Sequence, residues 1–195
     1  MKQRISNMVA RSLTVFFKSI ANLFFQQRYG HRAVVLETIA AVPGMVAAFF
    51  CHLETLRNGR FETTPEMNDM LHEAENERMH LMIILQVVKP SMIERMLIVS
   101  AQVIFTIGYS FLYLLSRSTS HRMIEFFEQE AVQSYTNYIA LVDNGTIENV
   151  PAPLISLDYY RLPETSSFRD VLEKIKEDEF NHYQANKKIA DFLEV

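Results

Sequence analysis

The chain has 195 residues, a net charge of −4 at pH 7, one cysteine and no tryptophan. The single cysteine, Cys51, excludes a disulfide bond within the chain, and the small acidic net charge argues against nucleic-acid binding. Only 5 residues are glycine, so the composition favours long helices joined by short turns over sheets. Without a linker or low-complexity segment, we expect a single domain over residues 1–195.

Hydrophobic periodicity predicts six helices, at residues 8 to 26, 31 to 57, 66 to 88, 91 to 116, 120 to 143 and 167 to 193. Several helix ends carry the expected residues. Pro65 precedes the third helix and Pro90 follows it, while Asn144 ends the fifth. Ser167 is a predicted cap for the last helix, and Pro43 predicts a kink in the second.

The first predicted helix combines positive charge with a wide apolar side. No acidic residue precedes Glu37, whereas the basic residues there are Lys2, Arg4, Arg11, Lys18, Arg28 and Arg32. Its apolar side consists of Val9, Leu13, Phe16, Phe17, Ile20, Leu23, Phe24 and Phe25. This pattern is typical of a helix that lies in a membrane interface, although an organellar presequence is also basic, amphipathic and poor in acids.

The second and third predicted helices place acidic residues on apolar faces. Glu37 lies on a stripe of small residues, and Glu77 with His80 shares a face with Met70, Ala74, Leu81, Ile84 and Val88. A buried carboxylate without a counter-ion costs several kcal/mol or gives up its charge. Because residues three apart are neighbours on a helix, the imidazole of His80 can reach the same cation as Glu77.

The fourth predicted helix contains an uncharged run from Leu97 to Leu115, which is long enough to qualify as a transmembrane helix. A single crossing would place Glu77 and Glu128 on opposite sides of the bilayer, so they could not share a metal site. We therefore expect this helix to pack in the bundle and to dip its other face into one leaflet, as in a monotopic membrane protein.

The last two predicted helices repeat the pattern. Glu128 shares a stripe with Ile124, Ala131, Tyr135, Ile139 and Val142. Glu179 and His182 share a stripe with Leu172, Ile175, Ile189 and Leu193. A lone Glu from each of two helices plus a Glu-x-x-His pair from each of two others is the ligand set of di-iron and di-manganese proteins built on four-helix bundles.

The sequence therefore predicts an all-α, ferritin-like four-helix bundle, with additional helices that form a monotopic membrane-binding surface. Its predicted metal ligands are Glu37, Glu77, His80, Glu128, Glu179 and His182. Solvated charged faces or structural salt bridges are the alternative explanation for these residues.

Five segments carry a family resemblance: RYGHRAVVLETIAAVPGM, EAENERMHLM, FFEQEAVQSYT, IENVPAPLISLDYYRLP and KEDEFNHY. They are similar to the alternative oxidases, which are cyanide-insensitive ubiquinol oxidases. The resemblance implies two iron ions, oxidation of ubiquinol to ubiquinone, and reduction of dioxygen to water without proton pumping. It also implies a homodimer on one leaflet, at the matrix side of the mitochondrial inner membrane or the equivalent cytoplasmic face of another membrane.

Carried over residue by residue, the resemblance implies iron ligation by the same six residues. It places Arg32, Leu36, Glu130, Ala131 and Ser134 in the quinol pocket, with Ser134 standing where threonine is more usual. Tyr135 would lie near the irons as an electron or radical relay, the alternative being a core aromatic. Asn76, His121 and Asp178 would hold the ligands through hydrogen bonds, and Tyr160 replaces a common tryptophan.

Within the single domain, we expect residues 1–29 to form the basic amphipathic membrane-associated segment and residues 30–195 the di-iron helical bundle. Two other functions stay open at this stage. A quinone-ring hydroxylase uses a similar bundle and lipid surface, and a ferritin-like protein would bind or store iron without quinol chemistry.

Overall fold

The computed structural model describes residues 2–25, 28–59 and 65–194. In these ranges the chain forms seven helices: α1 (Lys2–Phe25), α2 (Tyr29–Asn58), α3 (Pro65–Val87), α4 (Met92–Leu115), α5 (Arg117–Asp143), α6 (Leu154–Tyr160) and α7 (Phe168–Leu193). The six predicted helices are therefore confirmed, with ends shifted by a few residues. The first begins six residues earlier than predicted, and the short α6 was not predicted.

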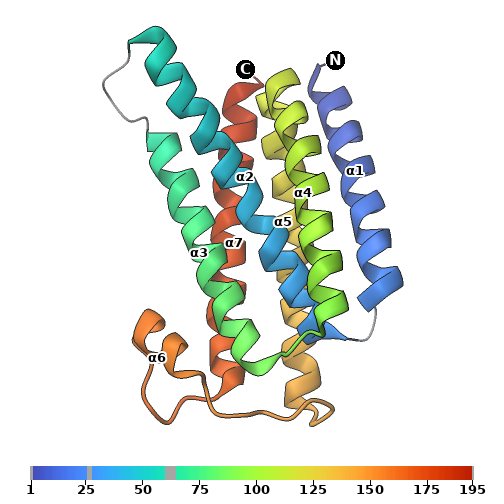
Figure 1. The fold of residues 1–195 in the computed structure, drawn as a ribbon, viewed down its shortest axis with the longest axis vertical. Helices are drawn as coiled ribbons and strands as arrows, with labels where there is room; N and C mark the ends of the chain where they lie inside the picture. Colours follow the sequence, from blue (N-terminus) through green and yellow to red (C-terminus); the bar gives the residue numbers. More distant parts are fainter. Residues whose placement is uncertain (1, 26–27, 60–64, 195) are drawn as a thin grey trace.

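Four long helices make the bundle, as Figure 1 shows. α2 packs along α3, and α5 packs along α7, so that two antiparallel pairs face each other. α4 packs on α2 and α5, and α1 packs on α5 and α2. The predicted four-helix bundle with additional helices is thus the observed architecture.

The helix ends follow from local sequence. Ser91 begins α4 with a reciprocal capping box to Glu94, and Ser167 does the same for α7 with Asp170. The predicted cap at Ser167 is therefore confirmed. Asn144 caps the end of α5, also as predicted. α2 continues as one helix through Pro43.

The core consists of two hydrophobic clusters at different heights along the bundle. One combines the start of α2 and α7 with the ends of α3 and α5, and includes Ile84, Tyr135 and Leu172. The other lies nearer the end of the bundle at which both chain termini lie (Figure 1), and it includes Val46 and Met123. On each of the four bundle helices, the predicted metal ligands lie between these two clusters.

Most of the predicted apolar stripes are buried. The stripe of Glu128 is buried along its whole length, from Ile124 to Val142. Leu81 and Ile189 are half-buried. Leu193, in the last turn of α7, is 36% exposed, so its predicted burial was wrong.

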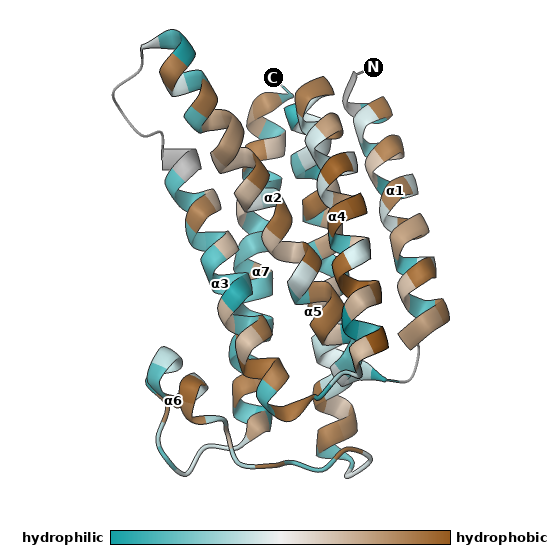
Figure 2. Cartoon of the chain, viewed as in Figure 1, coloured by the Kyte–Doolittle hydropathy of each residue, from teal (hydrophilic) through white to brown (hydrophobic). Residues whose placement is uncertain are grey.

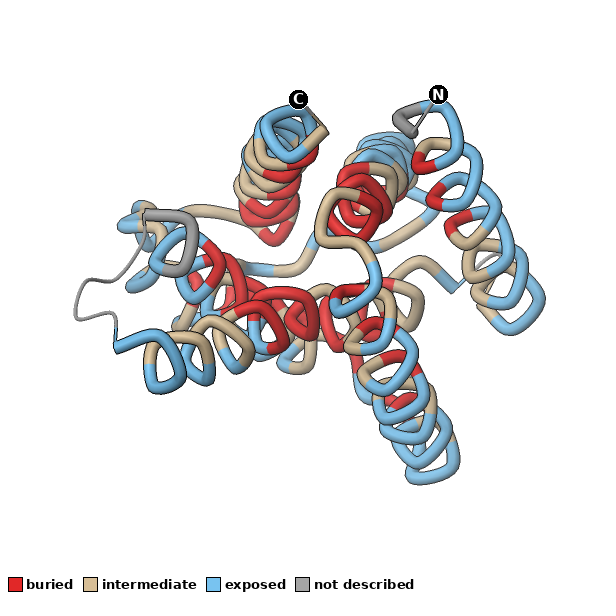
Figure 3. Tube along the Cα trace, turned by 90° about the horizontal axis from the view of Figure 1, so that it is seen from above, coloured by how far each residue is buried: buried red, intermediate tan, exposed pale blue. Residues whose placement is uncertain are grey.

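α1 and α4 carry the exposed apolar surface of the molecule (Figure 2). On α4 the exposed apolar residues are Met92, Ile93, Met96, Leu97, Val99, Val103, Ile104, Ile107, Phe111, Leu114 and Leu115. Figure 3 shows buried residues where the helices meet and exposed residues along the outward side of α1, which begins at the label N. Among the described residues, α1, α2 and α4 are long and apolar enough to cross a membrane by length and composition. More than half of the apolar stretch of α2, however, is buried in the bundle. These exposed apolar helices indicate membrane association.

Candidate metal centre

The structure brings all six predicted ligands together in two overlapping groups. One group contains Glu37, Glu77, His80 and Glu179, and the other contains Glu77, Glu128, Glu179 and His182. Within each group, one ligand atom per residue lies within 4.8 Å of the others. Because Glu77 and Glu179 belong to both groups, the arrangement suits two metal ions bridged by two carboxylates.

Each group combines one Glu-x-x-His pair with carboxylates from two other helices of the bundle. His80 Nδ1 lies 3.1 Å from Glu37 Oε2 and 3.2 Å from Glu179 Oε1. His182 Nδ1 lies 2.7 Å from Glu77 Oε1. The three-residue spacing within α3 and α7 thus turns each imidazole toward the acids, as the helical periodicity predicts.

The acids repel one another in the absence of a cation. Burial raises the pKa of Glu37 and of Glu128 well above the usual value, and the neighbouring carboxylates of Glu179 and Glu77 raise both further. A divalent cation between these groups would remove that penalty, because it attracts every carboxylate at once.

The two histidines partly compensate the acids. Burial alone would raise the pKa of Glu77, but its contacts with His182 and His80 hold it well below the usual value. Burial likewise lowers the pKa of His182, yet the Glu77 carboxylate raises it to about 9. The acids and imidazoles of the centre thus interact strongly with one another.

Orphaned polar atoms test whether a metal fits. Both carboxylate oxygens of Glu77, Oε1 of Glu179 and Nδ1 of His182 are buried and make no hydrogen bond of good geometry, although they lie in ion-pair contact with one another or with His80. Such buried atoms normally find a hydrogen-bond partner, and their residues all belong to the two ligand groups. Hard oxygen donors with two imidazoles match the donor set of iron or manganese, so the residues fit a metal pair.

Side chains outside the two groups hold His80 in place. Asp178 Oδ2 lies 3.1 Å from His80 Nε2. The same oxygen accepts hydrogen bonds from Asn76 Nδ2 at 3.1 Å and from the Tyr160 hydroxyl at 2.8 Å. Asn76 also donates to the Tyr159 hydroxyl at 2.7 Å. Asn76, Asp178 and Tyr160 thus form a hydrogen-bonded group beside His80, while their role in holding a metal ligand stays a prediction.

His121 is not among these side chains around His80. It is buried on α5, and its Nδ1 lies 2.9 Å from Asn186 Oδ1. Asn186 in turn donates to Glu73 Oε1 at 2.7 Å and to the His182 carbonyl oxygen at 3.1 Å. His121 is therefore linked to the ligand-bearing part of α7 through Asn186.

Tyr135 lies against the predicted ligands. Its hydroxyl donates a hydrogen bond to Glu37 Oε1, and its ring belongs to the hydrophobic cluster next to the acids. Burial and the nearby carboxylates of Glu37 and Glu179 raise its pKa well above the usual value, so the hydroxyl keeps its proton. The expected proximity to the ligands is thus seen, while the role of Tyr135 as a relay stays a prediction.

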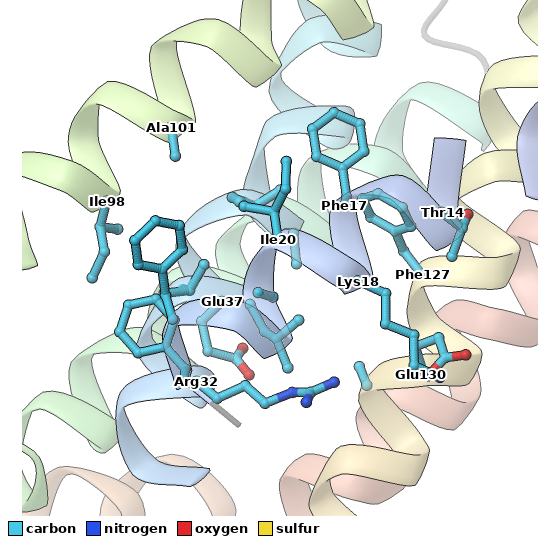
Figure 4. Close-up of a pocket in the computed structure, with 18 of the residues that line it drawn as sticks. Thr14, Phe17, Lys18, Ile20, Arg32, Glu37, Ile98, Ala101, Phe127 and Glu130 are labelled. Atoms are coloured by element: carbon cyan, nitrogen blue, oxygen red, sulfur yellow. The ribbon is translucent and has the colours of Figure 1, made fainter. Parts of the chain in front are cut away.

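A cavity of about 410 Å³ connects the apolar side of the molecule to the acids (Figure 4). Its outer walls come from α1 and α4, with Phe16, Phe24, Leu97 and Ile104. Its inner end includes the ligand residues Glu37, Glu128 and Glu179. The cavity is almost wholly apolar, as expected for a site that binds a lipid-soluble molecule.

Four of the five residues predicted for the quinol pocket line this cavity: Arg32, Leu36, Glu130 and Ala131. Arg32 Nη1 donates to Asn22 Oδ1 at 2.5 Å, and Lys18 Nζ lies 2.5 Å from Glu130 Oε2. Both partners belong to α1. Ser134 is buried on α5 but is not part of the cavity lining, because it lies one turn beyond Glu130.

Comparison with known proteins decides the family. A model of the alternative oxidases matches residues 1–191. The chain belongs to the alternative oxidase family. Among alternative oxidase relatives, it is 44% identical over 187 residues to "Ubiquinol oxidase, mitochondrial" of Batrachochytrium dendrobatidis, covering 96% of this chain and 59% of that protein.

Two plant alternative oxidases are similarly related. "Ubiquinol oxidase 1c, mitochondrial" of Arabidopsis thaliana is 47% identical over 171 residues, which is 87% of this chain and 51% of that protein. "Alternative oxidase 3, mitochondrial" of Glycine max is 43% identical over 188 residues, or 96% of this chain and 57% of that protein. The chain spans about half the length of the curated relatives that it matches.

Some residues of this alternative oxidase site were not found from the sequence. Glu73 is buried one turn before Glu77, and Asn186 is buried one turn after His182. The four-residue spacing to Glu77 was an available signal for Glu73. For Asn186 and Tyr160 the partners come from other helices, so no local pattern indicates their role.

Proposed function

We propose that this chain is a ubiquinol oxidase with a di-iron centre. Two ubiquinols give four electrons and four protons to one dioxygen, which yields two ubiquinones and two waters, without cyanide inhibition and without proton pumping. The cavity that leads from the apolar side of α1 and α4 to Glu37, Glu128 and Glu179 carries this proposal. A substrate from the lipid phase would reach the acids through it without crossing water.

The six side chains Glu37, Glu77, His80, Glu128, Glu179 and His182 would hold the two irons. When bound, the irons supply a redox pair that takes electrons from the quinol and passes them to dioxygen. The protein would contribute the bridging carboxylates of Glu77 and Glu179 and a water-poor surrounding.

The polar residues of the cavity would orient the quinol. Arg32 and Glu130 bring a hydrogen-bond donor and an acceptor into an otherwise apolar space, and both suit the hydroxyl groups of a quinol ring. Leu36 and Ala131 would pack on the ring, while Ser134 would support Ala131 from the core. At the inner end, Glu37 Oε1 accepts a hydrogen bond from the Tyr135 hydroxyl, near the point where electrons would pass from quinol to metal.

We infer a monotopic attachment to one leaflet. α4 packs lengthwise on α2 and α5, and α5 packs on α7. A transmembrane α4 would therefore carry α7 into the bilayer, although α7 exposes charges such as Lys174 and Glu177. If α1 and α4 lie flat with their outward side chains in the lipid, the charged helices stay in water.

The family resemblance further supports a homodimer, and exposed Phe49, Leu53 and Leu56 on α2 offer apolar surface for a second copy. The names of the relatives include the word mitochondrial. We therefore place the protein on the matrix side of the mitochondrial inner membrane or on the equivalent cytoplasmic face of another membrane.

The decisive experiment measures oxygen uptake by the purified chain with a short-chain ubiquinol in the presence of cyanide, together with the iron content. We expect uptake with about two irons per chain and unmodified quinone as the product. Incorporation of an oxygen atom into the ring would establish a hydroxylase instead. Many irons per chain without quinol turnover would establish a storage protein.

A further inference from the structure

Each metal-binding imidazole needs a hydrogen-bond partner for the ring nitrogen that does not bind the metal. His80 obtains it from Asp178, whose Oδ2 lies 3.1 Å from its outer ring nitrogen. Metal-binding imidazoles commonly have such a carboxylate, which fixes the ring and raises its basicity. Asp178 belongs to neither ligand group, so it can serve His80 alone.

Asn186 is the centre of the corresponding arrangement around His182. It is almost completely buried, and its amide nitrogen donates both to the His182 carbonyl oxygen at 3.1 Å and to Glu73 Oε1 at 2.7 Å. Its amide oxygen faces His121 Nδ1 at 2.9 Å. Since Glu73 only accepts and His121 can donate, these neighbours determine which way the amide points.

Glu73 is a buried acid that is not one of the predicted metal ligands. It is 6% exposed, lies one turn before Glu77 on α3, and is a member of neither group. The amide nitrogen of Asn186 reaches both Glu73 Oε1, at 2.7 Å, and the His182 carbonyl oxygen, at 3.1 Å. Glu73 thus lies beside the turn of α7 that carries the His182 ring.

We propose that Glu73, held in place by Asn186, is the positioning carboxylate of His182, as Asp178 is of His80. Asn186 ties the ligand-bearing turn of α7 to Glu73 on α3 and to His121 on α5, so that three helices fix this imidazole. The inference rests on the proposed di-iron centre and concerns the metal site that contains His182.

The test measures metal affinity directly. The full-length protein is stripped of metal and titrated anaerobically with Fe²⁺, and the two binding constants are compared between variants. Glu73→Gln keeps the size of the side chain but removes its charge, and we expect one site to bind about 10- to 100-fold more weakly while the other is unchanged. Asn186→Leu should weaken the same site, because it releases Glu73.

Glu75→Gln is the matched control. Glu75 lies on the same helix and pairs with Arg78 at the surface, so its substitution removes an equal charge without touching the centre. We expect both binding constants to stay at the wild-type values.

Thermal unfolding of the metal-free variants separates positioning from a structural role. Removal of a buried acid should leave the unfolding midpoint of Glu73→Gln unchanged or raise it. A lower midpoint with two wild-type binding constants, or a loss shared equally by both sites, would overturn the inference. If the wild-type chain itself fails to bind two irons, the proposed function fails, whereas two wild-type sites that persist in both variants contradict the inference alone.

Discussion

Glu77 and Glu179 occupy the most constrained positions of the centre, because each belongs to both ligand groups. Loss of either carboxylate would remove one ligand from each metal and half of the bridging charge. The remaining acids, Glu37 and Glu128, each belong to a single group. The bridging pair should therefore be the least tolerant of substitution.

Glu179→Ala should abolish quinol oxidase turnover and reduce the iron content well below two per chain. The change removes a carboxylate that belongs to both ligand groups, so each metal would lose one oxygen donor. Oxygen uptake and iron analysis of the same preparation measure both effects. Glu177→Ala is the control, since Glu177 pairs with Lys174 at the surface of the same helix. Near-normal turnover of Glu179→Ala would refute the metal assignment.

Tyr135→Phe tests the hydroxyl that donates to Glu37. If Tyr135 relays electrons, the variant should retain about two irons per chain and lose at least about tenfold in turnover, a barrier increase of about 1.4 kcal/mol. Tyr138→Phe serves as a comparison, because Tyr138 packs on Phe168 one turn further from the acids. Wild-type turnover of Tyr135→Phe would assign Tyr135 to the core alone.

The sequence predicted the candidate metal ligands better than it predicted the residues that form hydrogen bonds around them. The Glu-x-x-His spacing and the apolar setting of Glu77 and Glu179 predicted a convergence that the structure shows. Glu73 and Asn186 were missed, since a hydrogen bond between side chains 113 residues apart leaves no trace in local periodicity. Such contacts depend on how the helices pack, which sequence patterns do not specify.

Among the elements, α2 and α3 approach each other closely at Gly44. A Cβ atom there would lie 2.3 Å from the Met70 carbonyl oxygen and 2.9 Å from the Ala74 side chain. Both contacts are too short, and a backbone oxygen cannot move aside without displacing α3. The glycine thus permits the packing that brings Glu37 near Glu77.

Gly44→Val should destabilise the protein by about 3 kcal/mol, as expected for an overpacked helix contact. The midpoint of thermal unfolding in detergent measures the effect, and iron content should fall with it. Gly108→Ala is the control, because a Cβ at Gly108 on α4 meets nothing within 4 Å. That change should stabilise the protein by about 0.5–1 kcal/mol. Equal midpoints for both variants would contradict the close approach.

The start of α4 depends on pH through Glu94. Its hydrogen bonds with Ser91 lower its pKa to about 2, helped by Arg28 at 2.6 Å. Because the pKa is depressed in the folded state, the stabilisation is present above the ordinary value of 4.5 and is lost as the pH falls toward 2. Glu94→Gln should therefore lower stability by about 1 kcal/mol at pH 7. The difference in unfolding midpoint should vanish near pH 2, and a difference that grew in acid would contradict this assignment.

The predicted elements differ from the observed ones mainly at α6. Its 7 residues follow Pro151 and Pro153, and they are too few to show a clear apolar period. α6 nevertheless carries Tyr159 and Tyr160, which bond to Asn76 and Asp178 near His80. Long amphipathic helices were thus predictable, whereas a short helix of about two turns, stabilised by tertiary contacts, was not.

At the scale of the whole molecule, the main feature is the connection between the apolar side, formed by α1 and α4, and the candidate metal centre. The residue pattern indicated two apolar helices and four acid-bearing ones, whereas the pocket between them was expected only from the family resemblance. That cavity depends on the gap between α1 and α4 and on the side chains that line it. In the proposed function, a single surface would serve two purposes, attachment to lipid and entry of a lipid-soluble substrate.

Ile107→Asp tests attachment through α4. Ile107 is 68% exposed on the apolar side, and a carboxylate there would have to enter the lipid surface. We expect binding to phosphatidylcholine and phosphatidylglycerol vesicles to fall at least about tenfold in co-sedimentation, since loss of one buried isoleucine alone costs about 1.5–3 kcal/mol. Leu71→Asp is the matched control, because Leu71 is an exposed apolar residue on α3, outside the proposed membrane side. A similar loss of binding in both variants would mean that the vesicles do not bind specifically to the side formed by α1 and α4.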